Sequence, residues 1–327
     1  MHPQGQNPVK VQSQALKGSH PARTPLVLIH DGGGTTFGYW LLGHLQRDVW
    51  ALHNPHFWSG QPWEGGIDAM ARHYIGLIFD AGIRGPILLG GWSLGGYLSI
   101  VMSRLLAERH EHADITISGL LLIDSPYHTP WAKNGESMDR FPEPVLPSLP
   151  PLVKTSFKHC DKMLPSWVLP TWDGPFCGGQ ESRITAGGRT FQVKCGMIPH
   201  KPTDSDWVIV NRQRCPLHHE PAEPSSPPPA ILVRCNQYEN PVNPSEHPCR
   251  VDKYRGDPLL GWEQSYHRFI KAVIDVDSGH YGLFNAYNRE QVVNTALDML
   301  ESLEAVESSS TGSMKDCEPS LSQPAVI

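Results

Sequence analysis

A glycine–serine–glycine motif between an apolar run and a helix-like segment constrains the fold more than any other part of the chain. The motif Gly91-Trp92-Ser93-Leu94-Gly95 follows the apolar residues 86–90, and a segment with helical character begins at Leu94. A strand, a G-x-S-x-G turn and a helix in this order are typical of a nucleophile elbow. The turn is so tight that its glycines are needed on both sides of the serine. The pattern therefore predicts that the Ser93 hydroxyl projects above the edge of a sheet as a nucleophile.

Apolar runs of strand length alternate with helical patterns through most of the chain. Buried parallel strands are predicted at residues 25–30, 49–53, 86–90, 119–123, 230–234 and 271–276. Helices are predicted at residues 67–79, 94–109 and 289–306, the last of them capped by Asn288. This alternation indicates a mostly parallel sheet with helices on both faces. Together with the elbow, it predicts an α/β protein with the α/β-hydrolase fold.

The regular pattern is interrupted between residues 126 and 229, where the chain is rich in proline. We interpret this stretch as an inserted lid with a helical piece at 151–163, because a structureless loop of this length would be unusual in a compact domain. Within it, residues 174–225 contain isolated strand-like runs at 190–193 and 207–210, but they fit no plan of helices and strands.

The remaining boundaries follow from composition at the two ends. Residues 1–20 are expected to form a polar lead-in, which contains one short strand-like run at 9–11. Residues 21–306 would then be a single hydrolase domain. Residues 307–327 are rich in serine and polar groups, and we expect them to be disordered.

Composition excludes several classes of function. The 327 residues carry a net charge of −6, which argues against broad binding to nucleic acid or to an anionic membrane. No apolar run is long enough for a transmembrane helix, and the N-terminus lacks the apolar core of a signal peptide. The seven cysteines form no C-x-x-C pair, so neither a metal centre nor a disulfide framework is expected. We expect a cytoplasmic enzyme without a metal or a cofactor of its own.

An elbow serine requires a base and a group that orients the base. His280 follows the last predicted strand, and Asp124 ends the strand after the elbow helix. Because the carboxyl ends of parallel strands share one edge of a sheet, both should lie near Ser93. Glu239, which follows the next strand, is the alternative acid. A carboxylate at a rigid strand end orients an imidazole better than one in a loop, which favours Asp124.

The oxyanion of an acyl-transfer intermediate requires backbone N–H donors. One is expected from Leu94, directly after the nucleophile. The other should come from the glycine run after the first predicted strand, His30-Asp31-Gly32-Gly33-Gly34, which allows close approach of the backbone to a carbonyl oxygen. Either Gly32 or Gly33 could supply it, and the sequence does not separate them.

Four segments together resemble a known family: LVLIHDGGG, LLGGWSLGGYLS, GLLLIDSPY and VDSGHYGLF. The set is similar to the thioesterase domains of polyketide synthases and nonribosomal peptide synthetases, especially those of fungi. Trp92 next to the serine is typical of these domains, as is an acid directly after the strand that follows the elbow helix, which supports Asp124. The resemblance covers residues 25–165 and 228–305, whereas residues 174–225 depart from it.

The resemblance implies an activity and a partner. The serine would take an acyl or peptidyl chain from the phosphopantetheine thioester of a carrier protein, and water or an internal nucleophile would then resolve the acyl-enzyme. Because the chain contains no carrier domain, we expect it to act in trans on a separate megasynthase. Side chains of the elbow and the lid are candidates to line an acyl channel: Trp92, Phe157, Met163, Leu164, Trp167 and Trp172.

Two other functions are compatible with the same residues. A Ser-His-Asp triad does not distinguish thioesters from oxygen esters, so the chain could be an ester hydrolase or an acyltransferase for free small molecules. The irregular segment 174–225 also allows a catalytically silent partner of a megasynthase, if the lid leaves the triad idle. Labelling of Ser93 by a fluorophosphonate would argue against this last hypothesis.

Overall fold

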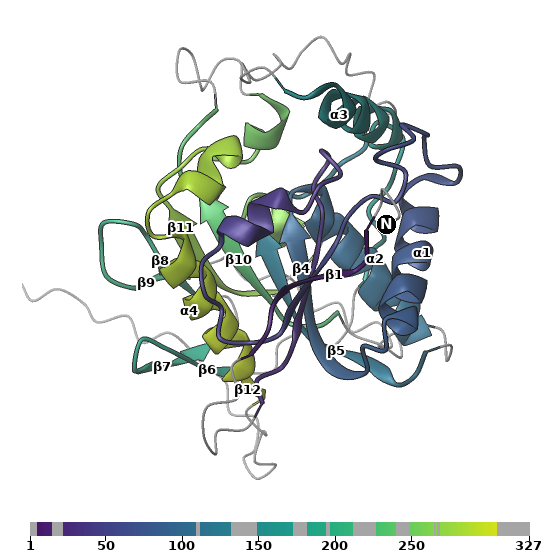
Figure 1. Cartoon of the computed structure of the whole chain (residues 1–327). Helices are drawn as coiled ribbons and strands as arrows, with labels where there is room; N and C mark the ends of the chain where they lie inside the picture. Colours follow the sequence, from purple (N-terminus) through teal and green to yellow (C-terminus); the bar gives the residue numbers. More distant parts are fainter. Residues whose placement is uncertain are drawn as a thin grey trace, which may run out of the picture.

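A central sheet organises the computed structural model, which describes residues 5–14, 22–108, 112–131, 149–172, 182–193, 197–211, 227–239, 249–264, 266 and 269–305. Within these residues nine strands form the sheet in the order β1-β3-β2-β4-β5-β10-β11-β8-β9 (Figure 1). Their bounds are β1 Val9–Gln12, β2 Leu26–Ile29, β3 Val49–Leu52, β4 Gly85–Trp92, β5 Ile115–Ile123, β8 Met197–Lys201, β9 Val208–Asn211, β10 Ala230–Cys235 and β11 Ile270–Val276. Neighbouring strands are parallel except β1 with β3 and β9 with β8.

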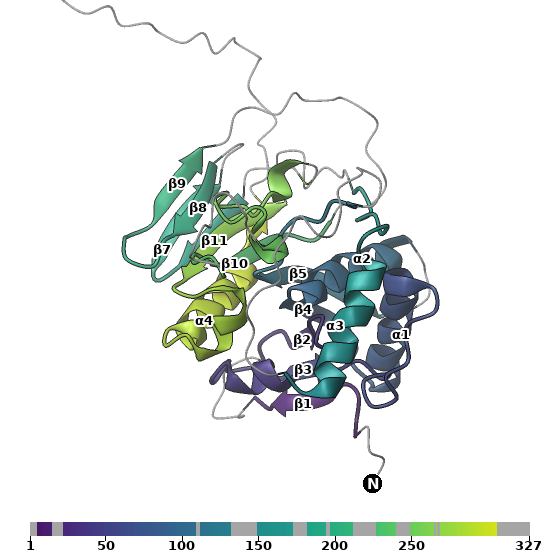
Figure 2. The same ribbon diagram turned by 90° about the horizontal axis from the view of Figure 1, so that it is seen from above.

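Helices cover both faces of the sheet, which confirms the predicted α/β-hydrolase fold. Helices α1 (Gly66–Asp80) and α2 (Leu94–Glu108) pack on one face, and α4 (Arg289–Glu301) packs on the other (Figure 2). Strand β2 shows why both faces are apolar: successive residues point to opposite faces and all four are fully buried. Asn288 precedes α4 as predicted, but its side chain makes no capping hydrogen bond.

The proline-rich interruption divides into two parts. Its first described element, α3 (Pro151–Met163), lies beside α1 and α2 (Figure 2). The described strands of the second part belong to sheets, which differs from the lid expected over residues 126–229. Strands β8 and β9 instead extend the main sheet, because β11 offers them an open edge for hydrogen bonding.

A second, smaller sheet also comes from this irregular segment. Strands β6 (Ser182–Ala186) and β7 (Arg189–Val193) form an antiparallel hairpin, and β6 also pairs with β12 (Glu304–Ala305). Two fully or nearly fully buried side chains of this hairpin, Ile184 and Ala186, join the core beneath α4. The remaining residues of segment 174–225 and the expected tail 307–327 lie outside the described residues.

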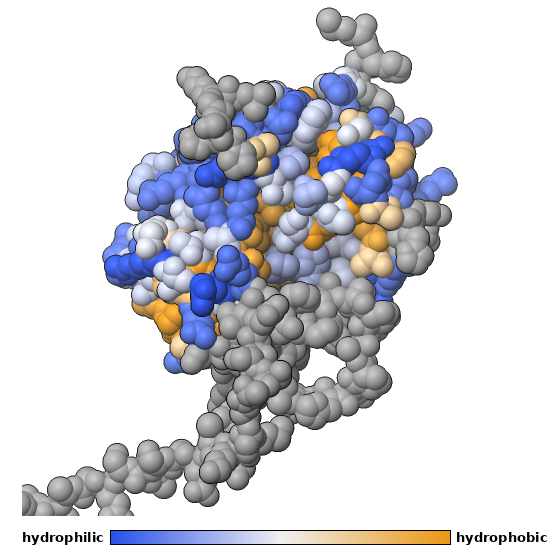
Figure 3. Space-filling model, turned by 90° about the horizontal axis from the view of Figure 1, so that it is seen from below, coloured by the Kyte–Doolittle hydropathy of each residue, from blue (hydrophilic) through white to orange (hydrophobic). Residues whose placement is uncertain are grey.

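One face of the described part, seen from below, is mostly polar (Figure 3). In the view from below, hydrophilic residues cover most of the face, and hydrophobic residues show between them in separate areas (Figure 3). Among the described residues, no helix combines the length and the apolar character needed to cross a membrane.

Candidate active site

The turn between β4 and α2 has the backbone geometry of an elbow. Ser93 has φ +55°, a left-handed conformation that is unusual for a residue other than glycine. The turn passes directly over β2: a Cβ at Gly91 would lie 2.5 Å from the Ile29 carbonyl oxygen, and one at Gly95 would collide with the same oxygen. Only glycine fits at these two positions, so the motif holds Ser93 in a strained conformation at the carboxyl end of β4.

His280 and Asp124 meet at the same edge of the sheet. The Nδ1 atom of His280, just after β11, lies 2.7 Å from Oδ2 of Asp124, at the end of β5. Both side chains are buried. The Trp92 ring packs against the imidazole with 5.1 Å between ring centres, which places the base beside the elbow. The structure therefore brings the predicted base and acid into contact next to Ser93.

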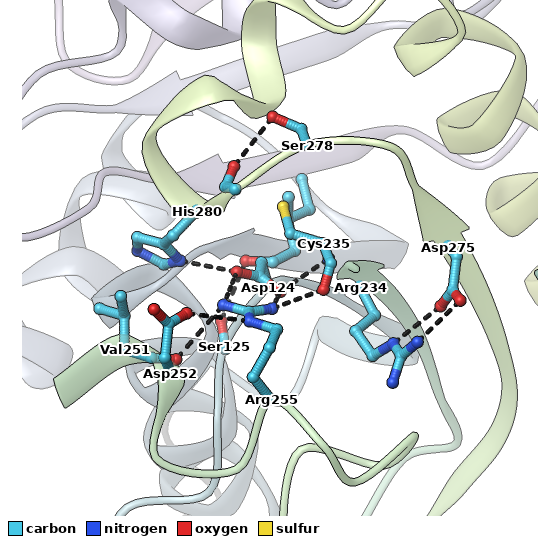
Figure 4. A network of polar contacts seen from close by, with 12 residues as sticks. Asp124, Ser125, Arg234, Cys235, Val251, Asp252, Arg255, Asp275, Ser278 and His280 are labelled. Carbon is cyan, nitrogen blue, oxygen red and sulfur yellow. Dashed lines mark hydrogen bonds and ion pairs between the residues drawn. The ribbon is translucent and has the colours of Figure 1, made fainter. Parts of the chain in front are cut away.

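Asp124 has a second set of partners that the sequence reasoning missed. The Arg255 guanidinium binds both carboxylate oxygens, with Nη1–Oδ1 at 2.6 Å and Nη2–Oδ2 at 2.8 Å (Figure 4). The Cys235 backbone N–H donates a further hydrogen bond to Oδ1. Burial alone would raise the pKa of Asp124, but the Arg255 charge and the hydrogen bonds outweigh it and hold the pKa well below its usual range. Because the carboxylate is ionised, His280 Nδ1 carries the proton and Nε2 is the basic nitrogen.

Arg255 in turn contacts a second buried acid. Its Nε lies 3.0 Å from Oδ1 of Asp252, one helical turn earlier in the chain. The other oxygen of Asp252 accepts hydrogen bonds from the Cys249 thiol and from the Glu239 backbone N–H. Residues three apart lie on the same side of a helical turn, so the spacing of Asp252 and Arg255 could have predicted this ion pair from the sequence.

The alternative acid, Glu239, has a different task in this arrangement. Its Oε1 accepts a hydrogen bond of 2.7 Å from the Tyr281 backbone N–H, the residue after His280. In the described part of the chain, Asp124 is the carboxylate bonded to the His280 ring. Glu239 therefore holds the backbone of the histidine loop, and Asp124 holds the ring.

The two candidate oxyanion donors in the glycine loop after β2 differ in the hydrogen bonds that their N–H groups make. The Gly33 N–H faces the Asp31 carboxylate, and the Gly34 N–H donates to the Asp31 carbonyl oxygen at 3.0 Å. Gly32 makes no hydrogen bond through its N–H to any residue that the structure describes. Of the two candidates, Gly32 is therefore the one whose N–H has no hydrogen-bond partner among the described residues.

Two titratable groups of this loop are buried. Burial lowers the pKa of His30 to about 4, and its Nε2 lies 2.5 Å from the Tyr74 hydroxyl. Burial raises the pKa of Asp31 to about 6, although the Gly33 N–H and the His280 charge oppose this effect. His30 is therefore neutral near pH 7. Asp31 is mostly ionised at this pH, and its buried charge lowers the stability of the fold.

A cavity opens beside Ser93 between α2, α3 and the segment after β5. It has an empty volume of about 620 Å³, including its open mouth. Its walls combine aromatic, aliphatic and basic side chains: Leu94, Tyr97, Tyr127, His128, Trp131, Cys160, Leu164, Arg250, Val251 and Lys253. A mainly apolar cavity that reaches a nucleophile is suited to an acyl chain.

The predicted channel residues take different places. Leu164 lines the cavity. Met163, Leu164 and Trp167 all pack against the core under α1 and α2, and Trp92 packs against the core under α4. The Trp167 ring also contacts Tyr97 and His128 of the cavity wall. Trp172 is buried in the core. Leu164 therefore lies in the wall of this cavity together with Cys160, which shares its face of α3, whereas Met163 does not. That the other side chains line an acyl channel stays a prediction.

Phe157 takes a position of its own on α3. Its ring would lie 3.1 Å from a Cβ at Gly32, so it covers the glycine loop rather than the cavity. Any side chain at Gly32 would crowd against this ring. The absence of a side chain there lets α3 pack directly against the glycine loop. Phe157 is thus near the reacting groups but is not part of the described cavity wall.

An elbow serine and a His–Asp pair at the carboxyl edge of a parallel sheet are the arrangement typical of hydrolases with the α/β-hydrolase fold. Comparison with known proteins narrows the class. The family model described as thioesterase domain matches residues 24–154. The chain is 43% identical to the probable thioesterase KK1J of Curvularia clavata, over 90% of this chain and 96% of that relative. It is 41% identical to the probable thioesterase lcsE of Purpureocillium lilacinum, over 94% and 99% of the two chains.

A third relative belongs to a much longer protein. The nonribosomal peptide synthetase imqB of Aspergillus flavus is 27% identical over 86% of this chain, which corresponds to 8% of the synthetase. The first two relatives match almost end to end at more than 40% identity. The chain therefore belongs to the thioesterase family and is a thioesterase.

Proposed function

We propose that this thioesterase uses Ser93 as nucleophile to release or edit an acyl or peptidyl chain, carried as a phosphopantetheine thioester, in the biosynthesis of a secondary metabolite. The observation that carries the proposal is the His280–Asp124 hydrogen bond of 2.7 Å beside the strained elbow. The match to part of a nonribosomal peptide synthetase supports a carrier protein as the partner. The two relatives of similar length favour a carrier on a separate protein.

In the first half of the reaction, Ser93 Oγ attacks the thioester carbonyl carbon and His280 Nε2 accepts its proton. The carbonyl oxygen becomes an oxyanion, which the N–H groups of Leu94 and Gly32 bind. Collapse of this intermediate breaks the C–S bond, and His280 returns the proton to the thiolate. The products are an acyl-Ser93 ester and the free phosphopantetheine thiol.

In the second half, His280 deprotonates a water molecule or an internal nucleophile of the chain as it attacks the ester carbonyl. The same two N–H groups bind the second oxyanion, and the proton then returns to Ser93. Asp124 stays ionised throughout and stabilises the imidazolium that forms in both halves. The cavity beside Ser93 would hold the acyl chain while its carbonyl lies at the elbow.

Ser93→Ala tests the nucleophile directly. The purified protein would receive a carrier protein loaded with octanoyl-phosphopantetheine, and release of octanoate would be measured together with the intact mass of the enzyme. The wild-type enzyme should show an octanoyl adduct that Ser93→Ala lacks, and release should fall by about 10³-fold or more. Ser103→Ala is the matched control, since this buried serine of α2 donates only to the Ser99 carbonyl.

The same assay distinguishes the other hypotheses. A strong preference for octanoyl alkyl esters over carrier-bound and N-acetylcysteamine thioesters would favour an ester hydrolase. Undiminished release by Ser93→Ala would refute the proposed nucleophile. Failure of a fluorophosphonate to label Ser93 would favour a catalytically silent partner.

A further inference from the structure

A cation lies directly on the acid of the proposed triad. Arg255 is fully buried, and its guanidinium forms a two-pronged ion pair with Asp124 (Figure 4). The acid of a Ser-His-Asp triad acts through its negative charge, which stabilises the imidazolium that forms in the transition state. An arginine that neutralised this charge without compensation would weaken the base.

Asp252 supplies the compensation. It is buried, binds Arg255 Nε through one oxygen, and uses the other to accept hydrogen bonds from Cys249 and from the Glu239 backbone. Asp124, Arg255 and Asp252 together carry one net negative charge, the same as an isolated triad aspartate. Protonation of His280 would therefore make these four residues neutral together, which a site without solvent favours. Asp31 of the glycine loop, a buried carboxylate that also acts on the His280 charge, lies outside this set and is the same in every variant below.

The same residues hold Asp124 in a costly conformation. Asp124 has φ +42°, a strained backbone conformation. Such strain persists only where several contacts hold the residue in place. Three groups fix it: the fork of Arg255, the Cys235 N–H on Oδ1, and its own N–H, which donates to the Val233 carbonyl at 2.7 Å. Arg255 also donates to the Cys235 carbonyl at 2.7 Å, so it ties the ends of β5 and β10 together.

We propose that Arg255 and Asp252 are positioning residues of this active site. Arg255 fixes the Asp124 carboxylate where it can accept the His280 Nδ1 proton, and Asp252 restores the net negative charge on which the base depends. The proposal rests on the proposed roles of Ser93, Asp124 and His280.

Asp252→Asn removes one negative charge and keeps an oxygen for Arg255, although its amide NH2 takes the place of the oxygen that accepts from Cys249 and Glu239. The readouts are hydrolysis of octanoyl-N-acetylcysteamine and the rate of Ser93 phosphonylation by a fluorophosphonate, each followed from pH 5 to 9. Loss of the charge disfavours the imidazolium, so kcat/KM should fall about tenfold and its acid limb should move about one pH unit lower. KM should change little, since neither residue reaches the substrate carbonyl.

Arg255→Lys provides the complementary variant. It keeps the net charge but replaces the fork by a single ammonium, so kcat should fall about tenfold or more while the acid limb stays in place. This variant also keeps the proposal testable if Asp252→Asn does not fold.

The neighbouring strands offer a matched control. Arg234 forms the same two-pronged pair with Asp275, with both N–O distances at 2.8 Å, and the structure shows no contact between this pair and His280 (Figure 4). Asp275→Asn should lower the stability of the fold as Asp252→Asn does, but its pH profile should be that of the wild-type enzyme. The proposal is overturned if Asp252→Asn and Arg255→Lys behave like Asp275→Asn. If Ser93→Ala stays active, the proposed function fails instead, and the two failures are distinguishable.

Discussion

Replacing Asp31 by asparagine should stabilise the fold at neutral pH, and the gain should disappear in acid. The Asp31 side chain is 7% exposed and lies in the glycine loop between β2 and α3. Burial raises its pKa from an ordinary value of 3.8 to about 6, against the opposing influence of the Gly33 N–H and of His280. Asparagine has nearly the same shape and can still face the Gly33 N–H, but it carries no charge.

The size of the effect follows from linkage. Each pKa unit corresponds to 1.36 kcal/mol, so a rise from 3.8 to about 6 amounts to about 3 kcal/mol. The sign is that of an acid whose folded pKa is raised: the native state binds more protons than the unfolded state between these two values. Its stability therefore decreases as the pH rises from about 4 to about 6, and the full cost of the buried carboxylate applies above that range.

Urea unfolding of the wild type and of Asp31→Asn at pH 4, 6 and 8 measures this directly. The variant should be more stable by about 2–3 kcal/mol at pH 8, by less at pH 6, and by little at pH 4. Asp80→Asn, at the exposed end of α1, is the control and should stay within about 0.5 kcal/mol at every pH. No gain at pH 8, or a gain of equal size at all three values, would refute the reasoning.

Three further predictions follow from other parts of the structure. Gly95→Ala places a Cβ against the Ile29 carbonyl oxygen, so the turn should not reach its native conformation and Ser93 should react more slowly with a fluorophosphonate. Labelling at the wild-type rate would contradict this prediction. Leu164→Trp narrows the cavity beside Ser93 and should lower kcat/KM for octanoyl-N-acetylcysteamine about tenfold while sparing the acetyl thioester; equal effects on both would show that chains do not enter there. Glu301→Ala leaves the fully buried Arg47 without its carboxylate and should cost about 2–4 kcal/mol in urea unfolding with kcat unchanged; a loss under about 0.5 kcal/mol would disagree with the ion pair.

The elements of the sheet were predictable because each carries a local signal. Strands such as β2 and β11 are continuous apolar runs, and such runs indicate strands buried on both faces. Strand β8 carries no such signal, because it contains Pro199 and His200. Strand β9 has a short apolar run at 208–210, but it is largely exposed, and the run does not show where the strand pairs. Their place depends on the open edge of β11, and a partner so far away in the sequence leaves no periodicity in the segment itself.

The residues at the carboxyl edge were predictable for a related reason. Ser93 and Asp124 each follow directly on a strand, and His280 lies in the turn after β11, so the parallel sheet brings all three to one edge. The Asp31 contact with Gly33, which distinguishes Gly32 from Gly33, depends on loop geometry that residue types do not determine. Arg255 was missed because its partner Asp124 lies 131 residues earlier, and only the fold joins them.

The attachment of the irregular segment explains why it can coexist with an intact His–Asp pair. His200 of β8 lies 3.0 Å from Oδ2 of Asp275, which Arg234 also binds, so a buried polar contact joins the insertion to β10 and β11. Asp275 lies one residue before the end of β11, whereas His280 lies beyond that end and is held by Asp124 and, through Tyr281, by Glu239. The insertion and the catalytic loop thus depend on different contacts of the same strand. Mutations that loosen β8 should therefore lower stability before they alter the geometry of the His280–Asp124 pair.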